Sequence, residues 1–197
     1  MQDLLGMKIS SICYCNLSND NNIIITENSE SLLISQKQNK NETITTLKNL
    51  ETGSEDYFIR DEVKGTIYSS ITGKTINTEN IIYDKEVYSS RGGDIFIKTS
   101  TIKYSTIELL VGIGGTLSKI AAAVLVYCSI PASAGVVLIL KVLGYLGVGT
   151  AGALYVAYPN GGLKLDQYDV ERSSIRGGVT YYYYVRSYKN VRHVSVV

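Results

Sequence analysis

The chain is poor in the residues from which catalytic and metal centres are usually built. It has three cysteines (Cys13, Cys15 and Cys128), which form no CxxC pair and show no metal-ligand spacing. Its single histidine, His193, lies near the C-terminus, so no Ser-His-Asp or Cys-His set can be assembled around it. We therefore expect a protein that is not an enzyme, with no catalytic, cofactor-binding or metal-binding residues and no cofactor.

An excess of charge of either sign is also missing. Lysine and arginine number 19 and aspartate and glutamate 18, which gives a formal net charge of +1 at pH 7. The long-range field that gathers a polyanion around a strongly basic protein is therefore absent, and we expect no nucleic-acid partner. The one aromatic and basic segment, Tyr181 to Tyr184 with its neighbouring arginines, favours a sheet face or an interfacial anchor over nucleic-acid stacking.

Tryptophan is absent and proline occurs twice, whereas tyrosine occurs 16 times against two phenylalanines. Tyrosine has an apolar ring and a polar hydroxyl, which suits strand faces that are partly exposed to water. β-Branched and aromatic residues near period two predict strands over 57–60, 66–71, 81–88 and 94–104, with a hairpin turn at 91–93. In the tail, Gly177-Gly178 predicts a second hairpin within 163–197, and this second ribbon can pair with the first.

The N-terminal part of the chain is polar. Residues 1–16 lack the continuous apolar core and cleavage site of a secretory signal, so no signal peptide is visible. Residues 16–56 are rich in Asn, Ser, Thr, Gln and Glu, and we interpret 1–56 as a disordered arm or a removable pro-segment. The alternative is two short strands, at Ile23–Ile25 and at Leu32–Ile34.

Nearly all the strong hydrophobicity is concentrated in residues 106–158. The stretches 106–128 and 135–158 are each about the 20 residues that a helix needs to cross a bilayer, and Pro131 marks a turn between them. This pattern predicts a Gly-rich hydrophobic helical hairpin. The pairs Gly147 with Ala151 and Gly149 with Ala153 are typical of close helix packing in membranes.

Two lysines and two tyrosines are the expected membrane contacts of this hairpin. Lys119 and Lys141 lie at a similar depth from the Pro131 turn, near the bilayer midplane and without an acidic partner there, which costs about 3 kcal/mol each. Tyr155 and Tyr158 suit an interfacial belt. The cost falls if the helices oligomerise around water, if they lie in the interface with snorkelling lysines, or if they pack inside a soluble domain.

One motif carries a resemblance to a known class of exported peptide. Ser105, Glu108, Leu109, Gly114 and Gly115 match the spacing of the double-glycine leaders that precede bacteriocins, although this match lies in mid-chain. The lysine-dotted Gly/Ala-rich stretch that follows, and more broadly residues 57–197, resemble exported bacteriocin-like membrane-active proteins of Gram-positive bacteria. The resemblance implies a secreted or membrane-associated protein.

Together these patterns predict an α+β protein in which antiparallel β-ribbons flank the 106–158 hairpin within one domain over 57–197. The expected function is a non-enzymatic membrane-interacting or membrane-permeabilising protein whose partners are a lipid bilayer and, in an oligomer, further copies of itself. The alternative is a soluble structural or interaction domain with a buried helical hairpin.

Overall fold

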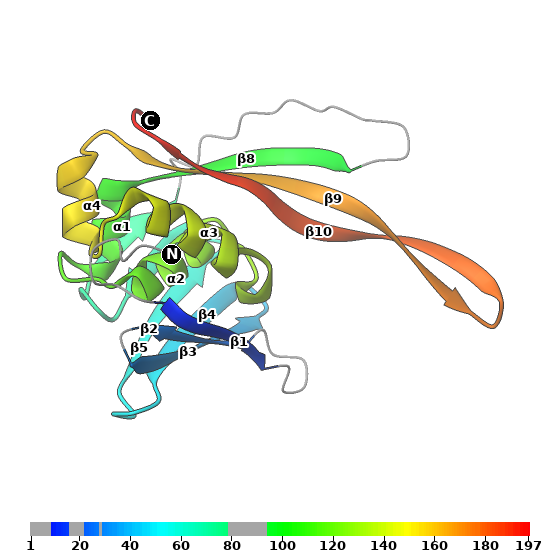
Figure 1. Ribbon diagram of the computed structural model, residues 1–197, viewed down its shortest axis with the longest axis horizontal. Coiled ribbons are helices and arrows are strands. Elements are labelled where there is room, and N and C mark those ends of the chain that lie inside the picture. The colour runs from blue at the N-terminus through cyan, green and yellow to red at the C-terminus, as the bar shows by residue number, and fades with distance from the viewer. Residues whose placement is uncertain (1–8, 16–21, 28, 79–93) are drawn as a thin grey trace.

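The computed structural model describes residues 9–15, 22–27, 29–78 and 94–197. These residues form a helical layer between a seven-stranded and a three-stranded antiparallel sheet (Figure 1). The predicted α+β class is confirmed. The predicted strand over 81–88 and the turn at 91–93 lie outside the described residues.

The first sheet is a meander in which every strand pairs antiparallel with its neighbour in the sequence. Its strands are β1 (Ile9–Cys15), β2 (Asn22–Glu27), β3 (Glu30–Asn39), β4 (Glu42–Asn49), β5 (Glu55–Asp61), β6 (Thr66–Ser69) and β7 (Thr75–Asn77). Buried and less buried residues alternate along β2, β5 and β6, because one sheet face packs on the helices and the other faces water. The main apolar side chains on the packed face are Ile23, Ile25, Ile34, Leu47, Phe58 and Ile67.

The expectation of a disordered arm over 1–56 is wrong for the part of it that the structure describes. The alternative of strands at Ile23–Ile25 and Leu32–Ile34 is confirmed, since Ile23 pairs with Ile34 and Ile25 with Leu32. The side chains of Ile23, Ile25 and Ile34 are fully buried against the helical layer. Polar composition concealed these strands because each has only three apolar residues, and the strand ends and turns around them are rich in Asn, Ser, Gln and Glu.

Each of the two long helices expected over 106–158 is broken in two. The helices are α1 (Tyr104–Val111), α2 (Leu117–Tyr127), α3 (Ala132–Leu146) and α4 (Ala151–Ala157). Gly112 ends α1 with a φ of 74°, and Gly147 ends α3 in the left-handed region with a φ of 66°. Glycine takes up these positive φ values without the cost of a Cβ clash, so residues that suggested close helix packing instead terminate helices.

The connection between α1 and α2 is joined by hydrogen bonds to the start of α4, after the connection between α3 and α4. Ala151 N–H donates to the Gly115 carbonyl at 2.9 Å, and Gly152 N–H donates to the Ile113 carbonyl at 2.9 Å. The first amides of α4 therefore find their acceptors in the α1–α2 connection. Gly152 is needed there, because a Cβ at this position would lie 2.5 Å from Ile113 Cγ2.

Among the described residues, no single helix has both the length and the apolar character to cross a membrane. Residues Gly135–Leu146 of α3 and Ala151–Ala157 of α4 meet that test only as a pair, and they are bent by 57° at the break between them. The shorter α2 is apolar and nearly completely buried.

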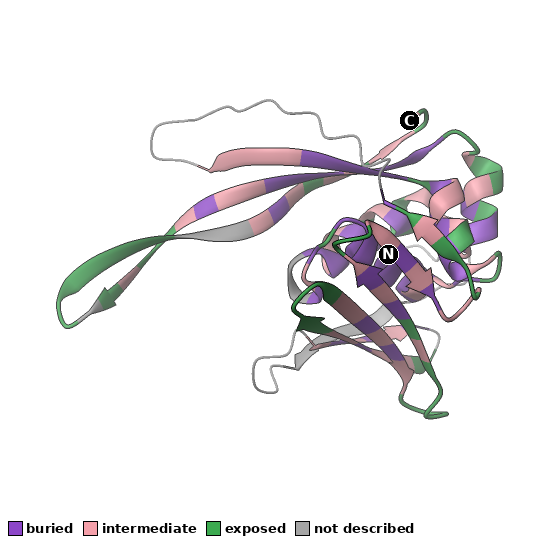
Figure 2. Cartoon of the chain, turned by 180° about the vertical axis from the view of Figure 1, so that it is seen from behind, coloured by how far each residue is buried: buried purple, intermediate pink, exposed green. Residues whose placement is uncertain are grey.

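The second sheet has the order β10-β9-β8, with strands β8 (Ile95–Lys103), β9 (Gly162–Arg176) and β10 (Val179–Val194). β8 pairs with β9 from Lys103 opposite Gly162 to Ile95 opposite Asp169, so the expected pairing of the two ribbons occurs. The turn at Gly177-Gly178 is also where the sequence places it, with φ values of 58° and 77°. Beyond Asp169, β9 and β10 continue as a ribbon that projects from the body, and its end is exposed (Figures 1 and 2).

Candidate functional surfaces

Polar side chains on the packed face of the first sheet contact α2. Asp56, which lies opposite Leu47 in the β4–β5 register, accepts a hydrogen bond from Lys119 Nζ on α2 at 2.8 Å. The expectation that Lys119 lacks an acidic partner is therefore wrong for the folded chain. Both side chains are about one-third exposed, so this ion pair lies at the rim of the interface rather than in a bilayer-like environment.

The two ends of α2 are satisfied by charged residues of the sheet. At its start, the buried Glu27 carboxylate accepts from Ser118 Oγ at 2.6 Å and from Ser118 N–H at 3.2 Å. At its end, the buried Arg60 guanidinium donates to the carbonyls of Tyr127 at 2.5 Å and Val126 at 3.2 Å. An anion at the helix N-terminus and a cation at the C-terminus both complement the helix dipole.

The α2–α3 connection is held in the same way. Gln36 on β3 accepts from the Ala132 N–H at 2.7 Å and donates to the Ile130 carbonyl at 3.2 Å. Pro131 lies between them as the residue before α3, which is where the sequence places the turn. From the other sheet, Tyr188 O–H on β10 donates to the Ser129 carbonyl at 3.2 Å, so side chains of both sheets form hydrogen bonds to this turn.

Sequence reasoning missed Glu27 and Asp56 because it interpreted residues 1–56 as a disordered arm, and it missed Arg60 because the strand predicted over 57–60 does not show which element covers it. The signal that could have found them is the strand alternation. Arg60 follows the inward Phe58 by two residues, and Glu27 follows the inward Ile25 by two. A charged residue at an inward position needs a partner on the layer that covers the sheet.

The other predicted membrane contacts lie in different environments. Lys141 on α3 is exposed, and Tyr155 on α4 is half-buried. Tyr158 packs between two aromatic rings, with its centroid 4.4 Å from His193 and 6.1 Å from Tyr104. Its half-buried ring therefore belongs largely to an internal cluster.

That cluster gives the lone histidine a structural role. The fully buried Tyr104 has its hydroxyl 2.7 Å from His193 Nδ1, and the two rings are stacked with centroids 5.8 Å apart. Burial raises the pKa of Tyr104, so its hydroxyl remains protonated and available as a donor. This contact ties the end of β10 to the start of α1.

The predicted helix-packing pairs do not form. Gly147 is the C-terminal cap of α3 and Gly149 lies in the loop, whereas Ala151 and Ala153 belong to α4. Neither pair lies on one helix, because the chain turns between the members of each pair. Ala151 is buried and Ala153 is exposed, so the two alanines do not share a packing face.

The buried cysteine fits the inert thiol that its apolar setting predicts. Cys128 is 3% exposed at the end of α2, and burial raises the pKa of its thiol to about 12. At neutral pH the thiol is protonated and a poor nucleophile. Among the described residues, no group of three or more His, Cys, Asp or Glu side chains is arranged to hold a metal ion.

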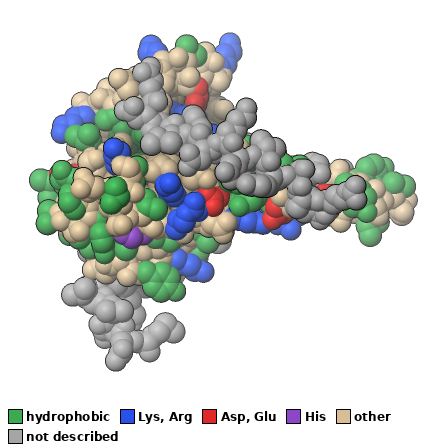
Figure 3. All heavy atoms as spheres, turned by 90° about the horizontal axis from the view of Figure 1, so that it is seen from above, with side chains coloured by type: hydrophobic (Ala, Val, Ile, Leu, Met, Phe, Trp, Pro, Cys, Tyr) green, Lys and Arg blue, Asp and Glu red, His purple; other side chains and the backbone are tan. Residues whose placement is uncertain are grey.

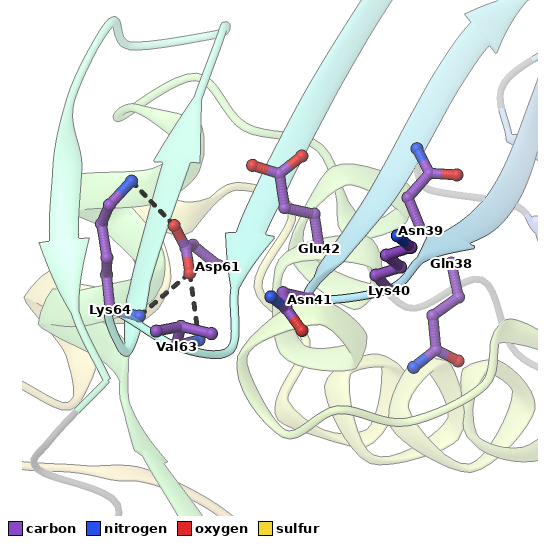
Figure 4. Close-up of a pocket in the computed structure, with 8 residues that line it drawn as sticks. All are labelled: Gln38, Asn39, Lys40, Asn41, Glu42, Asp61, Val63 and Lys64. Atoms are coloured by element: carbon purple, nitrogen blue, oxygen red, sulfur yellow. Dashed lines mark hydrogen bonds and ion pairs between the residues drawn. The ribbon is translucent and has the colours of Figure 1, made fainter.

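A broad hollow of about 740 Å³ lies between the β3–β4 and β5–β6 hairpin ends (Figure 4). Its lining is polar, and it includes Lys40, Glu42 and Asp61. The Asp61 carboxylate is used locally, since it accepts from the N–H groups of Val63 and Lys64 and pairs with Lys64 Nζ at 2.9 Å. These contacts lower the pKa of Asp61 and build the turn, so its carboxylate serves the turn rather than a ligand.

Most of the large apolar side chains that are exposed in the described residues belong to two regions. The helix-end surface, defined as Leu109, Ile113, Tyr145 and Val156, comes from α1, the α1–α2 connection, the end of α3 and α4, and these side chains are 43–90% exposed. The ribbon tip, defined as Ile175, Val179, Tyr181, Tyr182 and Tyr183, has side chains that are 47–75% exposed. α1 and α4 lie at the end of the molecule opposite the ribbon tip (Figure 1), and hydrophobic side chains dominate the end of the ribbon (Figure 3).

Comparison with protein families, curated proteins and solved structures finds no match to this chain.

Proposed function

We propose that the chain is a non-enzymatic membrane-interacting protein, exported and bacteriocin-like, that acts on a lipid bilayer through residues 106–158. The observation that carries the proposal is the helix-end surface. Its most exposed members are Tyr145 at 90%, Val156 at 79% and Ile113 at 71%. Large apolar side chains that remain exposed in neighbouring segments mark a surface that binds an apolar partner.

The bent pair of α3 and α4 is the segment best suited to enter the bilayer. It is the only part of the described chain that reaches spanning length and apolar character, and it ends at the helix-end surface. Lys141 is exposed on α3, where it can meet anionic head groups while its stem stays against apolar side chains. In water the two sheets cover the rest of the helical layer.

Entry of α2 into a bilayer requires its contacts with the first sheet to break. Lys119 must leave Asp56, Ser118 must leave Glu27, and the carbonyls of Val126 and Tyr127 must leave Arg60. These contacts favour a protein that is folded in water and contacts membranes first through α3 and α4. Assembly of several copies on the bilayer would supply partners for the polar groups that α2 loses.

The test is binding to, and dye release from, vesicles of phosphatidylglycerol and phosphatidylcholine. Replacing Ile113 and Val156 together with serine should lower dye release at least tenfold, because each removes about 1.5–3 kcal/mol of apolar transfer. The matched control is Val63→Ser, since Val63 is 74% exposed but lies in the β5–β6 turn, outside the helix-end surface. A native chain that neither sediments with the vesicles nor releases dye contradicts the proposal.

The second candidate is a soluble interaction domain, and the burial of α2 favours it. Ten of the eleven residues of α2 are buried, which is typical of a core helix. In this case the helix-end surface would bind a protein partner and the helical layer would stay between the sheets.

A further inference from the structure

The ribbon formed by β9 and β10 extends well beyond the sheet that supports it. β8 pairs with β9 as far as Asp169, and the seven residues of β9 from Val170 to Arg176 pair only with β10 among the described residues. At about 3.3 Å per residue this unsupported part is about 20 Å long. Its backbone edges pair with no further strand of the described residues, and its end is exposed (Figure 2).

The side chains at this end are unusually apolar for a projecting hairpin. Ile175 is 75% exposed, Tyr182 70%, Val179 54%, Tyr181 52% and Tyr183 47%. Alternation places Val179, Tyr181 and Tyr183 on one face of the ribbon and Tyr182 on the other. The described residues leave these side chains exposed, which makes the ribbon tip a candidate contact surface.

The tip carries two arginines beside its tyrosines. Residues 170–185 contain Arg172, Arg176 and one acidic residue, Glu171, which gives the unsupported ribbon a net charge of +1. Arg172 is exposed and pairs across the strands with Tyr183.

Tyrosine, aliphatic residues and arginine together suit the interface of an anionic bilayer. Tyrosine is enriched where hydrocarbon meets head groups, because its ring is apolar and its hydroxyl is polar. Arginines beside it are attracted to anionic lipids. A projecting tip with apolar residues on both faces fits a deformable surface, whereas a rigid protein groove would cover one face and leave the other in water.

We propose that the ribbon tip is an anchor that inserts its tyrosines into the head-group region of anionic bilayers. This proposal rests on the membrane function proposed above and adds a second contact, at the opposite end of the molecule from the helix-end surface. The anchor would bind first and bring the helical layer to the bilayer. It supplies affinity for anionic lipid, whereas α3 and α4 supply permeabilisation.

The absence of tryptophan makes a direct test possible. Tyr182→Trp places the chain's only tryptophan at the tip, and Tyr57→Trp places it on β5 as a control, since Tyr57 is 39% exposed on the first sheet. On phosphatidylglycerol vesicles we expect the emission of Tyr182→Trp to shift to shorter wavelength and to be protected from aqueous quenchers. We expect no change for Tyr57→Trp, and no change for either variant on vesicles of phosphatidylcholine alone.

Binding is then measured by co-sedimentation, separately from dye release. Replacing Arg172 and Arg176 together with glutamine should weaken binding about 25-fold, because each arginine near an anionic surface contributes about fivefold. Tyr181→Ser with Tyr183→Ser should weaken binding while the melting temperature stays unchanged, since these residues pack on no core. Binding without dye release by the native chain would overturn the permeabilising function but support the anchor.

Three results would overturn the anchor. The first is full vesicle binding by the tip variants, even if the Ile113 and Val156 variant loses dye release. The second is an emission shift of Tyr182→Trp that depends on protein concentration without lipid, which would make the tip a contact between copies. The third is an equal shift on single-stranded oligonucleotide, which would make it a nucleic-acid surface.

Discussion

Individual charged residues decide how the apolar helical layer is held. Glu27, Asp56 and Arg60 occupy inward positions of strands, and each finds its partner on α2. An unpaired charge at any of these positions would oppose burial of the layer, so the pairing specifies where α2 docks. These contacts could be expected only in outline from the sequence, because alternation marks the inward charge but does not identify a partner more than 60 residues away.

Asp166 on β9 provides a pH-dependent contact of the same kind. Burial alone would raise its pKa, but hydrogen bonds from Arg192 at 2.5 Å and Thr99 at 2.7 Å outweigh burial and hold the pKa below its ordinary value of 3.8. A lowered folded-state pKa means that this contribution to stability is complete above pH 3.8 and is lost as the pH falls through the folded pKa.

Asp166→Asn should therefore lower the free energy of unfolding at pH 7 by about 1–2 kcal/mol, because the charged hydrogen bonds weaken. The difference between the variant and the native chain should shrink below pH 3.8. Urea unfolding at pH 7 and at pH 3 measures both values. A difference that is the same at the two pH values would show that the contact is not charge-dependent.

At the scale of elements, β5, β6 and the strands of the second sheet were more predictable than the helices, whereas β1 to β4 were interpreted as a disordered arm and β7 was not predicted. Period-two alternation and Gly-Gly turns identify β5, β6, β8, β9 and β10 within a few residues, because both signals are local. The helices of 106–158 were predicted too long, since composition alone does not show that Gly112 and Gly147 adopt positive φ and act as caps. The length of the apolar stretches predicted a membrane hairpin of two long helices, whereas the chain forms four short helices.

The end of α2 gives a test of how strongly the first sheet holds this element. Arg60→Met keeps much of the side-chain volume but leaves the Val126 and Tyr127 carbonyls without their donor. We expect a loss of about 2–4 kcal/mol in the free energy of unfolding, or roughly 5–10 °C in the melting temperature.

The matched control is Lys64→Met, because Lys64 forms an exposed ion pair with Asp61 in the β5–β6 turn. It should lower the melting temperature by less than about 2 °C. Equal effects of the two substitutions in thermal unfolding would mean that Arg60 does not hold α2 in place.

At the scale of the whole molecule, the apolar helical layer lies between a seven-stranded and a three-stranded sheet. The first sheet and the second both contact α3, so the helical layer cannot leave without parting from both. The body thus has three layers, and most of the large apolar side chains that the described residues leave exposed belong to the ribbon tip and the helix-end surface.

Amide hydrogen exchange distinguishes the membrane protein from the soluble interaction domain. In the absence of lipid the α2 amides should be among the slowest to exchange, and the amides near Gly177 should be fast, because the unsupported ribbon lacks core contacts. On phosphatidylglycerol vesicles a membrane-inserting chain should change its protection pattern across α2, α3 and α4. Unchanged protection of these helices on vesicles that the protein binds would favour the soluble domain.

The order of the meander also bears on how the chain folds during synthesis. Each strand from β1 to β7 pairs with its neighbour in sequence, so the first sheet has only local pairings and can form without waiting for distant segments. All seven strands precede residues 106–158 and leave the ribosome before them. We expect this order of synthesis to shorten the time that the apolar helices spend without a covering surface.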